Sequence, residues 1–148
     1  MQKIDLTVGT VKMLKNYGQN PFKVNKVESI KILEKALQLG VCKLDTAESY
    51  GELNSIIPKS LLSCFDITSK ISIDLQNPIQ QIEKFFIKNP LVKKLLIHNA
   101  DLIFENKSED VIFACSNYFK SMFGLSMYSP EYTKIALEKG IKNFQIPC

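Results

Sequence analysis

The sequence lacks any long uninterrupted run of apolar residues. No stretch approaches the roughly 18 consecutive apolar residues that a membrane-spanning helix needs, so we expect no membrane association. Residues 1–5 also contain no apolar core of a signal peptide, because Asp5 interrupts the first apolar stretch. Together these absences predict a cytoplasmic protein.

Clustered cysteines, the usual mark of a metal or redox site, are missing as well. The four cysteines Cys42, Cys64, Cys115 and Cys148 are spaced too widely for a CxxC pair. The first three lie in or beside apolar runs, where a free thiol behaves as a small hydrophobe. We therefore expect reduced thiols in the core, a reducing compartment and no metal site.

Charge of one sign is not concentrated anywhere along the chain. The net charge is +4 and the lysines are spread over the whole length, so no basic stripe indicates a nucleic-acid partner. The 45% of hydrophobic residues and 23% of charged residues are typical of a globular protein and argue against disorder. We expect one domain over residues 1–148, with no internal repeat or linker.

What the sequence does contain is a regular alternation of short apolar runs and longer segments of helical periodicity. Expected helices are capped by Asn25, Ser108 and Ser129, or begin at a proline in the first turn. The expected strands cover residues 4–8, 41–45, 65–71, 92–98, 122–127 and 143–146, and the expected helices residues 25–39, 57–63, 77–89, 108–120 and 129–140. This strict alternation predicts a parallel α/β sheet.

Two architectures fit that order, a doubly wound sheet and a (β/α) barrel of the TIM type. No GxGxxG or GxxxxGK[ST] motif follows the first expected strand, which weakens the nucleotide-binding doubly wound folds. The barrel is favoured, although the order of elements alone leaves both open.

Polar side chains collect at the C-terminal ends of the expected strands, where parallel α/β folds carry their functional groups. Each has a structural alternative: an aspartate commonly caps a loop, a tyrosine is often a half-buried ring, and a lone histidine is more often structural than catalytic. Their coincidence on successive strand ends favours a function. The residues are Asp45, Tyr50, Lys70, His98, Ser126 and Gln145.

Four of these groups together could protonate a carbonyl oxygen. A phenol with a pKa of about 10 is a poor proton donor at neutral pH. A nearby Lys70 ammonium would bring the pKa of Tyr50 toward the working range, and Asp45 would keep that lysine charged and oriented. His98 could hydrogen-bond the same oxygen. The hydride would have to come from a cofactor, because no side chain supplies one.

The motifs around these residues resemble those of the aldo-keto reductases. The segment with the pattern Asp-Thr-Ala-x-x-Tyr-Gly is the most specific, and the matching segments together extend over essentially the whole chain. They are Gly9-Thr10-Val11, Leu44-Asp45-Thr46-Ala47-Glu48-Ser49-Tyr50-Gly51, Ser69-Lys70-Ile71, Leu96-Ile97-His98-Asn99, Gly124-Leu125-Ser126-Met127-Tyr128-Ser129-Pro130 and Gln145-Ile146-Pro147.

The resemblance implies a (β/α)₈ barrel that reduces a small aldehyde or ketone with NADPH or NADH. It implies that Tyr50 is the general acid and that Lys70 lowers its pKa. By the same resemblance, Asp45 pairs with Lys70, and His98 orients the carbonyl group of the substrate.

The resemblance also implies a cofactor site. Gly9, Thr10 and Asp45 would line the cofactor pocket, while Ser126 and Gln145 would bind the nicotinamide carboxamide. Met127 departs from the family pattern, because many members have an asparagine there.

A second departure concerns length. The sequence ends at Cys148, after about six expected strands, whereas complete barrels run to about 250 residues. The expectation is therefore a C-terminally truncated barrel without the loops that hold the cofactor phosphates in the family. The alternative to an oxidoreductase is a non-catalytic barrel remnant or interaction module. Exposed edge strands at residues 4–8 and 143–146 would favour self-association.

Overall fold

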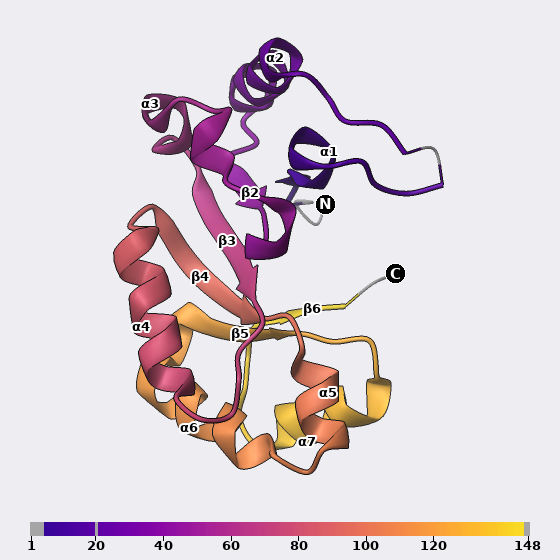
Figure 1. Cartoon of the computed structure of the whole chain (residues 1–148), viewed down its shortest axis with the longest axis vertical. Helices are drawn as coiled ribbons and strands as arrows, with labels where there is room; N and C mark the ends of the chain where they lie inside the picture. The colour runs from indigo at the N-terminus through magenta and orange to yellow at the C-terminus, as the bar shows by residue number, and fades with distance from the viewer. Residues whose placement is uncertain (1–4, 20, 147–148) are drawn as a thin grey trace. The chain divides into compact units, whose positions relative to one another are not determined.

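The computed structural model describes residues 5–19 and 21–146 and contains six strands in that part of the chain (Figure 1). The strands are β1 Thr7–Gly9, β2 Lys43–Asp45, β3 Asp66–Ile71, β4 Val92–Ile97, β5 Phe123–Ser126 and β6 Phe144–Gln145. Their order in the sheet is β1-β2-β3-β4-β5-β6, and the pairs β1–β2, β2–β3, β4–β5 and β5–β6 are parallel. The predicted parallel α/β fold is confirmed. The strictly sequential order also excludes a doubly wound sheet, in which the order reverses at a switch point.

All five expected helices are present, and two short helices accompany them that periodicity did not predict. The unpredicted helices α1 and α5 have four and six residues, too few for an apolar repeat to show. Within the described ranges, no helix is long and apolar enough to span a bilayer. The helices are α1 Val11–Leu14, α2 Lys26–Gln38, α3 Lys59–Leu62, α4 Pro78–Lys88, α5 Ala100–Glu105, α6 Glu109–Phe119 and α7 Pro130–Glu138, with 3₁₀ turns η1 Glu48–Tyr50, η2 Leu53–Ser55 and η3 Lys120–Met122.

The predicted helix starts are correct in position but not all in mechanism. The Asn25 side chain accepts a hydrogen bond from the backbone N–H three residues on (2.9 Å), and Ser129 does the same (3.3 Å). Ser108 occupies the N-cap position of α6, yet its hydroxyl donates to the Asn106 carbonyl (3.2 Å) and makes no cap. The expected Ser108 cap is therefore wrong. Gly40 follows α2 with a φ of +78°, a conformation that favours glycine.

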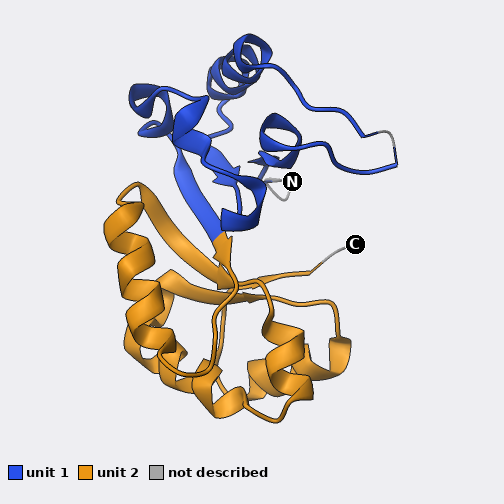
Figure 2. Cartoon of the chain, viewed as in Figure 1, with its two compact units in different colours: residues 1–69 blue, residues 70–148 orange. Residues whose placement is uncertain are grey.

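The chain divides into two compact units, Met1–Ser69 (unit 1) and Lys70–Cys148 (unit 2), coloured separately in Figure 2. The expectation of a single domain stays a prediction, and each unit is described by itself. Unit 1 contains α1, α2, α3 and the short strands β1 and β2. Its fully buried side chains include Leu33 of α2, Leu44 of β2, and Ile57 and Leu62 around α3.

Unit 2 contains a large apolar cluster between its strands and its helices. Helices α4 and α6 lie side by side, and α6 packs on β5 (Figure 1). The strands contribute alternate residues to this cluster, so the intervening residues point to the opposite face of the sheet. The strand residues in the cluster are Ile71, Leu95, Ile97, Phe123 and Leu125.

The opposite face of unit 2 carries residues of mixed size and polarity, among them the buried Leu96 of β4. Gly124 of β5 is one of them, and a Cβ at this position would lie 2.5 Å from the Asn143 carbonyl oxygen and 2.7 Å from a Leu96 methyl group. No side chain fits there, so glycine permits β4, β5 and β6 to pack closely at this level.

The cysteines do not all lie in the core. Cys115 of α6 is fully buried, and this burial raises the pKa of its thiol to about 11. Cys42 and Cys64 are exposed, so the expectation that they are core residues is wrong. Cys42 lies directly before β2 and Cys64 two residues before β3, and an apolar neighbour in such a connection does not guarantee burial. The described cysteines are free thiols, and Cys148 lies outside the described residues.

Candidate active site

Unit 1 places two of the predicted site residues at the end of β2. Asp45 is the last residue of the strand, and Tyr50 ends the 3₁₀ turn η1 that follows; both are half-buried. The Tyr50 N–H donates to the Ala47 carbonyl (3.0 Å), which closes the turn. Gly51 continues the chain with a φ of 119°, which only glycine adopts without strain. The Tyr-Gly pair of the motif thus has a local structural reason.

The predicted cofactor residues of unit 1 lie next to Asp45. Gly9 of β1 is in register with Asp45, and a Cβ added to Gly9 would meet no atom within 4 Å. Thr10 is completely buried, and its hydroxyl lies 3.1 Å from the Asp45 carbonyl oxygen and 2.9 Å from the Thr46 hydroxyl. Thr10 therefore fastens the turn after β1 to the end of β2, while Gly9 leaves open space beside it.

A second lysine, which the sequence analysis missed, lies beside Tyr50. The Lys15 ammonium is 5.1 Å from the centroid of the Tyr50 ring and donates to the Ser49 carbonyl (3.3 Å). This cation–π contact adds positive charge near the phenol within unit 1. Lys15 directly follows the short helix α1, which carries no periodic signal, so nothing in the sequence pattern indicated it.

Unit 2 contains Lys70 and His98. Lys70 lies near the end of β3, between Ser69 and Ile71, and is only 3% exposed although its side chain carries a charge. His98 is half-buried and directly follows β4. Its N–H donates to the Ile71 carbonyl (2.7 Å), and in a parallel ladder this bond sets His98 level with Ser72. Lys70 is two residues before that level and therefore points to the same face of the sheet.

His98, Ser126 and Gln145 come together on that face. Ser126 is in register with Gln145, and the β4–β5 register that pairs Ile97 with Leu125 sets His98 level with Ser126. Ile97 and Leu125 point into the apolar cluster, so the next residue of each strand points away from it. Three of the predicted site residues therefore form one row on the face that also carries Lys70.

The side-chain oxygen of Gln145 in this row has an unsatisfied hydrogen-bonding capacity. Gln145 is half-buried, and its Oε1 is inaccessible to solvent without a hydrogen-bond partner within residues 5–19 and 21–146. An unsatisfied buried acceptor costs about 1–3 kcal/mol, so a turn of the Gln145 amide toward a donor would be stabilising.

Met127 occupies the position at which many aldo-keto reductases have an asparagine, but it does not take over the role of that amide. Its side chain is fully buried in the apolar cluster, 3.9 Å from the Thr133 hydroxyl. Its backbone N–H donates to the Gln145 carbonyl (3.0 Å). The side chain and the backbone N–H of Met127 therefore both make their contacts within unit 2.

The predicted site residues fall into two groups. Gly9, Thr10, Asp45 and Tyr50 belong to unit 1, and Lys70, His98, Ser126 and Gln145 belong to unit 2. Among the described residues, no group of three or more His, Cys, Asp or Glu side chains is arranged to hold a metal ion.

The fold is similar to that of solved structures from Pseudomonas aeruginosa. Two structures, each described as a "putative aldo-keto reductase", match with a TM-score of 0.67 and 22% sequence identity. The matches cover 96% of this chain but only 62% and 61% of the two neighbours, so the chain spans about three-fifths of their length. No protein-family model matches the sequence, and no curated protein is significantly similar to it. The predicted resemblance is confirmed for the fold: the chain has the α/β architecture of part of an aldo-keto reductase barrel.

Proposed function

We propose that this chain is an oxidoreductase of the aldo-keto reductase type, which reduces a small aldehyde or ketone with NADPH or NADH. The observation that carries the proposal is the Ser126–Gln145 pair. The two residues are in register on neighbouring strands, and Gln145 Oε1 is buried without a hydrogen-bond partner in the described part of the chain. A nicotinamide carboxamide, which has both a donor N–H₂ and an acceptor oxygen, fits an amide and a hydroxyl side by side.

Two further observations support a cofactor site. The position of a Cβ on Gly9 is open, so a ligand could approach the backbone there. His98 stands level with Ser126 on the same sheet face, which would bring a carbonyl-orienting group close to the nicotinamide. When bound, the cofactor would supply the hydride.

The chain's own residues would handle the proton. In this proposal Tyr50 donates its phenolic proton to the carbonyl oxygen of the substrate. A cation near a phenol favours the phenolate and thereby lowers the pKa toward neutrality. By the resemblance, Lys70 would provide this charge and Asp45 would keep the lysine charged, and Lys15 already lies 5.1 Å from the Tyr50 ring. His98 would hydrogen-bond the substrate oxygen and hold it toward the phenol.

The test is a titration of the folded chain with NADPH and with NADH. The chain has no tryptophan, so the fluorescence of the reduced nicotinamide itself is the signal. Micromolar binding that is weakened in Gln145→Ala would support the proposal and lead to a screen of small carbonyl substrates. No binding at millimolar cofactor in a folded sample would contradict it and favour the alternative, a non-catalytic interaction module.

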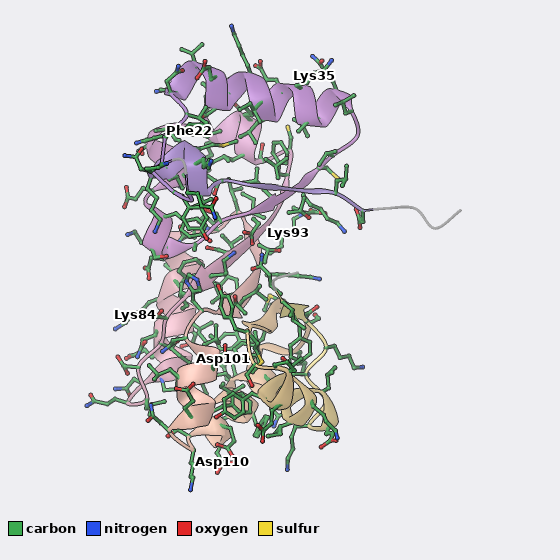
Figure 3. All side chains as sticks on the ribbon, turned by 90° about the vertical axis from the view of Figure 1, so that its right-hand side faces the viewer. Phe22, Lys35, Lys84, Lys93, Asp101 and Asp110 are labelled. Atoms are coloured by element: carbon green, nitrogen blue, oxygen red, sulfur yellow. The ribbon has the colours of Figure 1, made fainter. Side chains whose placement is uncertain are left out.

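The reaction itself is tested with Lys70→Met. Losing the ammonium should lower the turnover number by about 100-fold or more, because the phenol then keeps its high pKa. Lys84→Met is the matched control, since Lys84 is exposed on α4 (Figure 3). Equal turnover in the two variants would remove Lys70 from the mechanism.

We also propose that the chain associates with itself through its outermost strands. The strands β1 and β6 stand at the two ends of the strand order, and unpaired backbone groups of edge strands readily pair between chains. Light scattering during the cofactor titration measures this. A monodisperse monomer at all concentrations would overturn it.

A cytoplasmic location, with no membrane or nucleic-acid partner, remains a prediction.

A further inference from the structure

The segment that follows β4, residues 98–101, bonds to the chain beyond the ends of β3 and β5. Its first contact is made by Asn99. The Asn99 Nδ2 donates to the Ile73 carbonyl (2.9 Å), and Asn99 Oδ1 accepts from the Ile73 N–H (3.1 Å). One side chain thus satisfies both backbone groups of a residue that is only 4% exposed. These two hydrogen bonds extend the pairing between β3 and β4 beyond the last residue of each strand.

The second contact is made by Asp101, in the first turn of α5 (Figure 3). Its Oδ2 accepts from the Tyr128 N–H (2.8 Å) and its Oδ1 from the Ser129 N–H (3.2 Å). Ser129 is the N-cap of α7, so the carboxylate also lies at the positive end of that helix. Both oxygens of one side chain thereby fix the connection that follows Ser126.

Between them, the two side chains tie together the strand ends that carry the predicted site residues of unit 2. Two sets of hydrogen bonds keep the segment after Lys70 next to His98. One is made by the Asn99 side chain, and the other is the bond from the His98 N–H to the Ile71 carbonyl. Asp101 holds the connection after Ser126. Each contact fixes two atoms at once, which leaves the partner little freedom to rotate or slide.

We propose that Asn99 and Asp101 are positioning residues for the reduction. Asn99 sets His98 relative to Lys70, and Asp101 sets Ser126 and, through the β5–β6 ladder, Gln145. This inference rests on the proposed function, in which these four residues act. Displacements of about 1 Å at a catalytic centre can lower a rate by about 100-fold, so side chains that touch neither substrate nor cofactor can control turnover.

A spectroscopic test is available because the chain has a single histidine. Its imidazole gives one Cε1–Hε1 signal in an NMR spectrum, which reports the surroundings of His98 without any need for turnover. Asn99→Ala should shift or broaden this signal. Asn89→Ala is the control, since its Nδ2 also bonds a backbone carbonyl, that of Phe85 (2.9 Å), but at the C-terminal end of α4. A His98 signal in Asn99→Ala that matches the wild type would overturn the role of Asn99.

The same spectra test Asp101. Asp101→Ala should move the amide signals of Ser126 and Gln145, whereas Asp110→Ala, a loss of an exposed acid on α6, should leave them in place (Figure 3). Unchanged Ser126 and Gln145 signals in Asp101→Ala would overturn the role of Asp101. If either alanine variant fails to fold, Asn99→Asp and Asp101→Asn serve instead. Each keeps one of the two hydrogen bonds and should give a smaller change of the same kind.

Kinetics then separate the two roles. Asn99→Ala should lower the turnover number by about 10- to 100-fold and leave the Kd of NADPH within about twofold. Asp101→Ala should raise that Kd by about tenfold with a smaller effect on turnover. Equal effects of both variants on both constants would indicate a purely structural role. Full activity of Tyr50→Phe would refute the proposed mechanism, but it would leave the two NMR outcomes as they are.

Discussion

The two units of this chain differ in how they are built and in what they contribute. Unit 2 has strands of up to six residues and a continuous apolar cluster between strands and helices. Unit 1 has two strands of three residues and the first four residues of β3, and its buried apolar side chains are fewer. Both units leave large apolar side chains exposed, such as Leu39 (69%) in unit 1 and Ile87 (81%) in unit 2. The proposed proton donor Tyr50 belongs to unit 1, while the proposed nicotinamide contacts belong to unit 2.

This difference in packing bears on the proposed roles of Tyr50 in unit 1 and Gln145 in unit 2. A well-packed unit is suited to hold a cofactor in fixed geometry, because its side chains have little freedom. Unit 1, which has the smaller core, carries the proposed acid Tyr50 on a short 3₁₀ turn after β2. The ammonium group of Lys15, which follows α1, lies over the Tyr50 ring. We therefore expect substitutions of Tyr50 in unit 1 and of Gln145 in unit 2 to change different constants, turnover for Tyr50 and cofactor affinity for Gln145.

The largest expected effect separates those two responses. Tyr50→Phe should lower the turnover number by about 100-fold or more, since it removes the proton donor, and should leave the Kd of NADPH within about twofold. Gln145→Ala should instead raise that Kd by about tenfold. Tyr17→Phe, which removes the hydroxyl of an exposed tyrosine in unit 1, is the control. A Tyr50→Phe variant with full activity would refute the assigned acid.

The next largest expected effect is on the free energy of unfolding, when one buried leucine is shortened in each unit. Leu95 of unit 2 and Leu33 of unit 1 are both completely buried. We expect Leu95→Ala to reduce the free energy of unfolding by about 3–5 kcal/mol and Leu33→Ala by about 2–3 kcal/mol. The reason is that Leu95 is surrounded by the apolar cluster, whereas α2 has exposed apolar neighbours that can rearrange over the gap. Denaturant unfolding gives both values, and a larger loss for Leu33→Ala would reverse the comparison.

A smaller effect is expected from pH and is confined to unit 2. The folded state holds the pKa of Cys115 at about 11, above the ordinary value of 9.0, because burial disfavours the thiolate. The unfolded state therefore loses its proton first, so the stabilisation is complete below pH 9 and is lost as the pH rises toward 11. The loss should approach about 2 kcal/mol at the upper end of this window. It should disappear in Cys115→Ala and persist in Cys64→Ala, whose thiol is exposed.

The smallest effect concerns two helix starts, one in each unit. Asn25→Ala should cost about 1 kcal/mol of stability, because the side chain caps the first turn of α2. Ser108→Ala should change stability by only a few tenths of a kcal/mol, because the Ser108 hydroxyl makes no cap on α6. Thermal unfolding measures both, and an equal loss in the two variants would show that the cap geometry is not the determining factor.

The elements were predictable where local chemistry is strong. Helix α4 begins at Pro78, as the Asn-Pro pair predicted, and α7 begins at Pro130 with the expected Ser129 cap. Strand β2 is shorter than expected, since Val41 and Cys42 are in register with no residue of β1 or β3, although the Cys42 carbonyl still accepts from the Asp66 N–H (2.7 Å). A strand ends where its pairing ends, and pairing depends on residues far away in the sequence.

The candidate site was likewise predictable where the signal is local and not where it depends on distant contacts. The sequence indicated Asp45, Tyr50, Lys70 and His98 because polar residues follow apolar strands. It did not indicate Lys15 or Asp101, whose contacts lie in the β2–α3 and β5–α7 connections. Such contacts leave no periodic signal, because they join segments more than 25 residues apart.

By itself, the sequence determined the alternation of strands and helices, the starts of the longer helices and the position of polar residues at strand ends. These follow from local conformational preferences and from the burial that each segment needs. Only the tertiary structure decided the sequential strand order and the register that aligns His98, Ser126 and Gln145. It also showed that no side chain fits at Gly124 and that Gln145 Oε1 is buried without a partner in the described residues. The physical reason is that register is fixed by hydrogen bonds and packing between distant segments, and one residue of slip would turn every side chain of a strand to the other face.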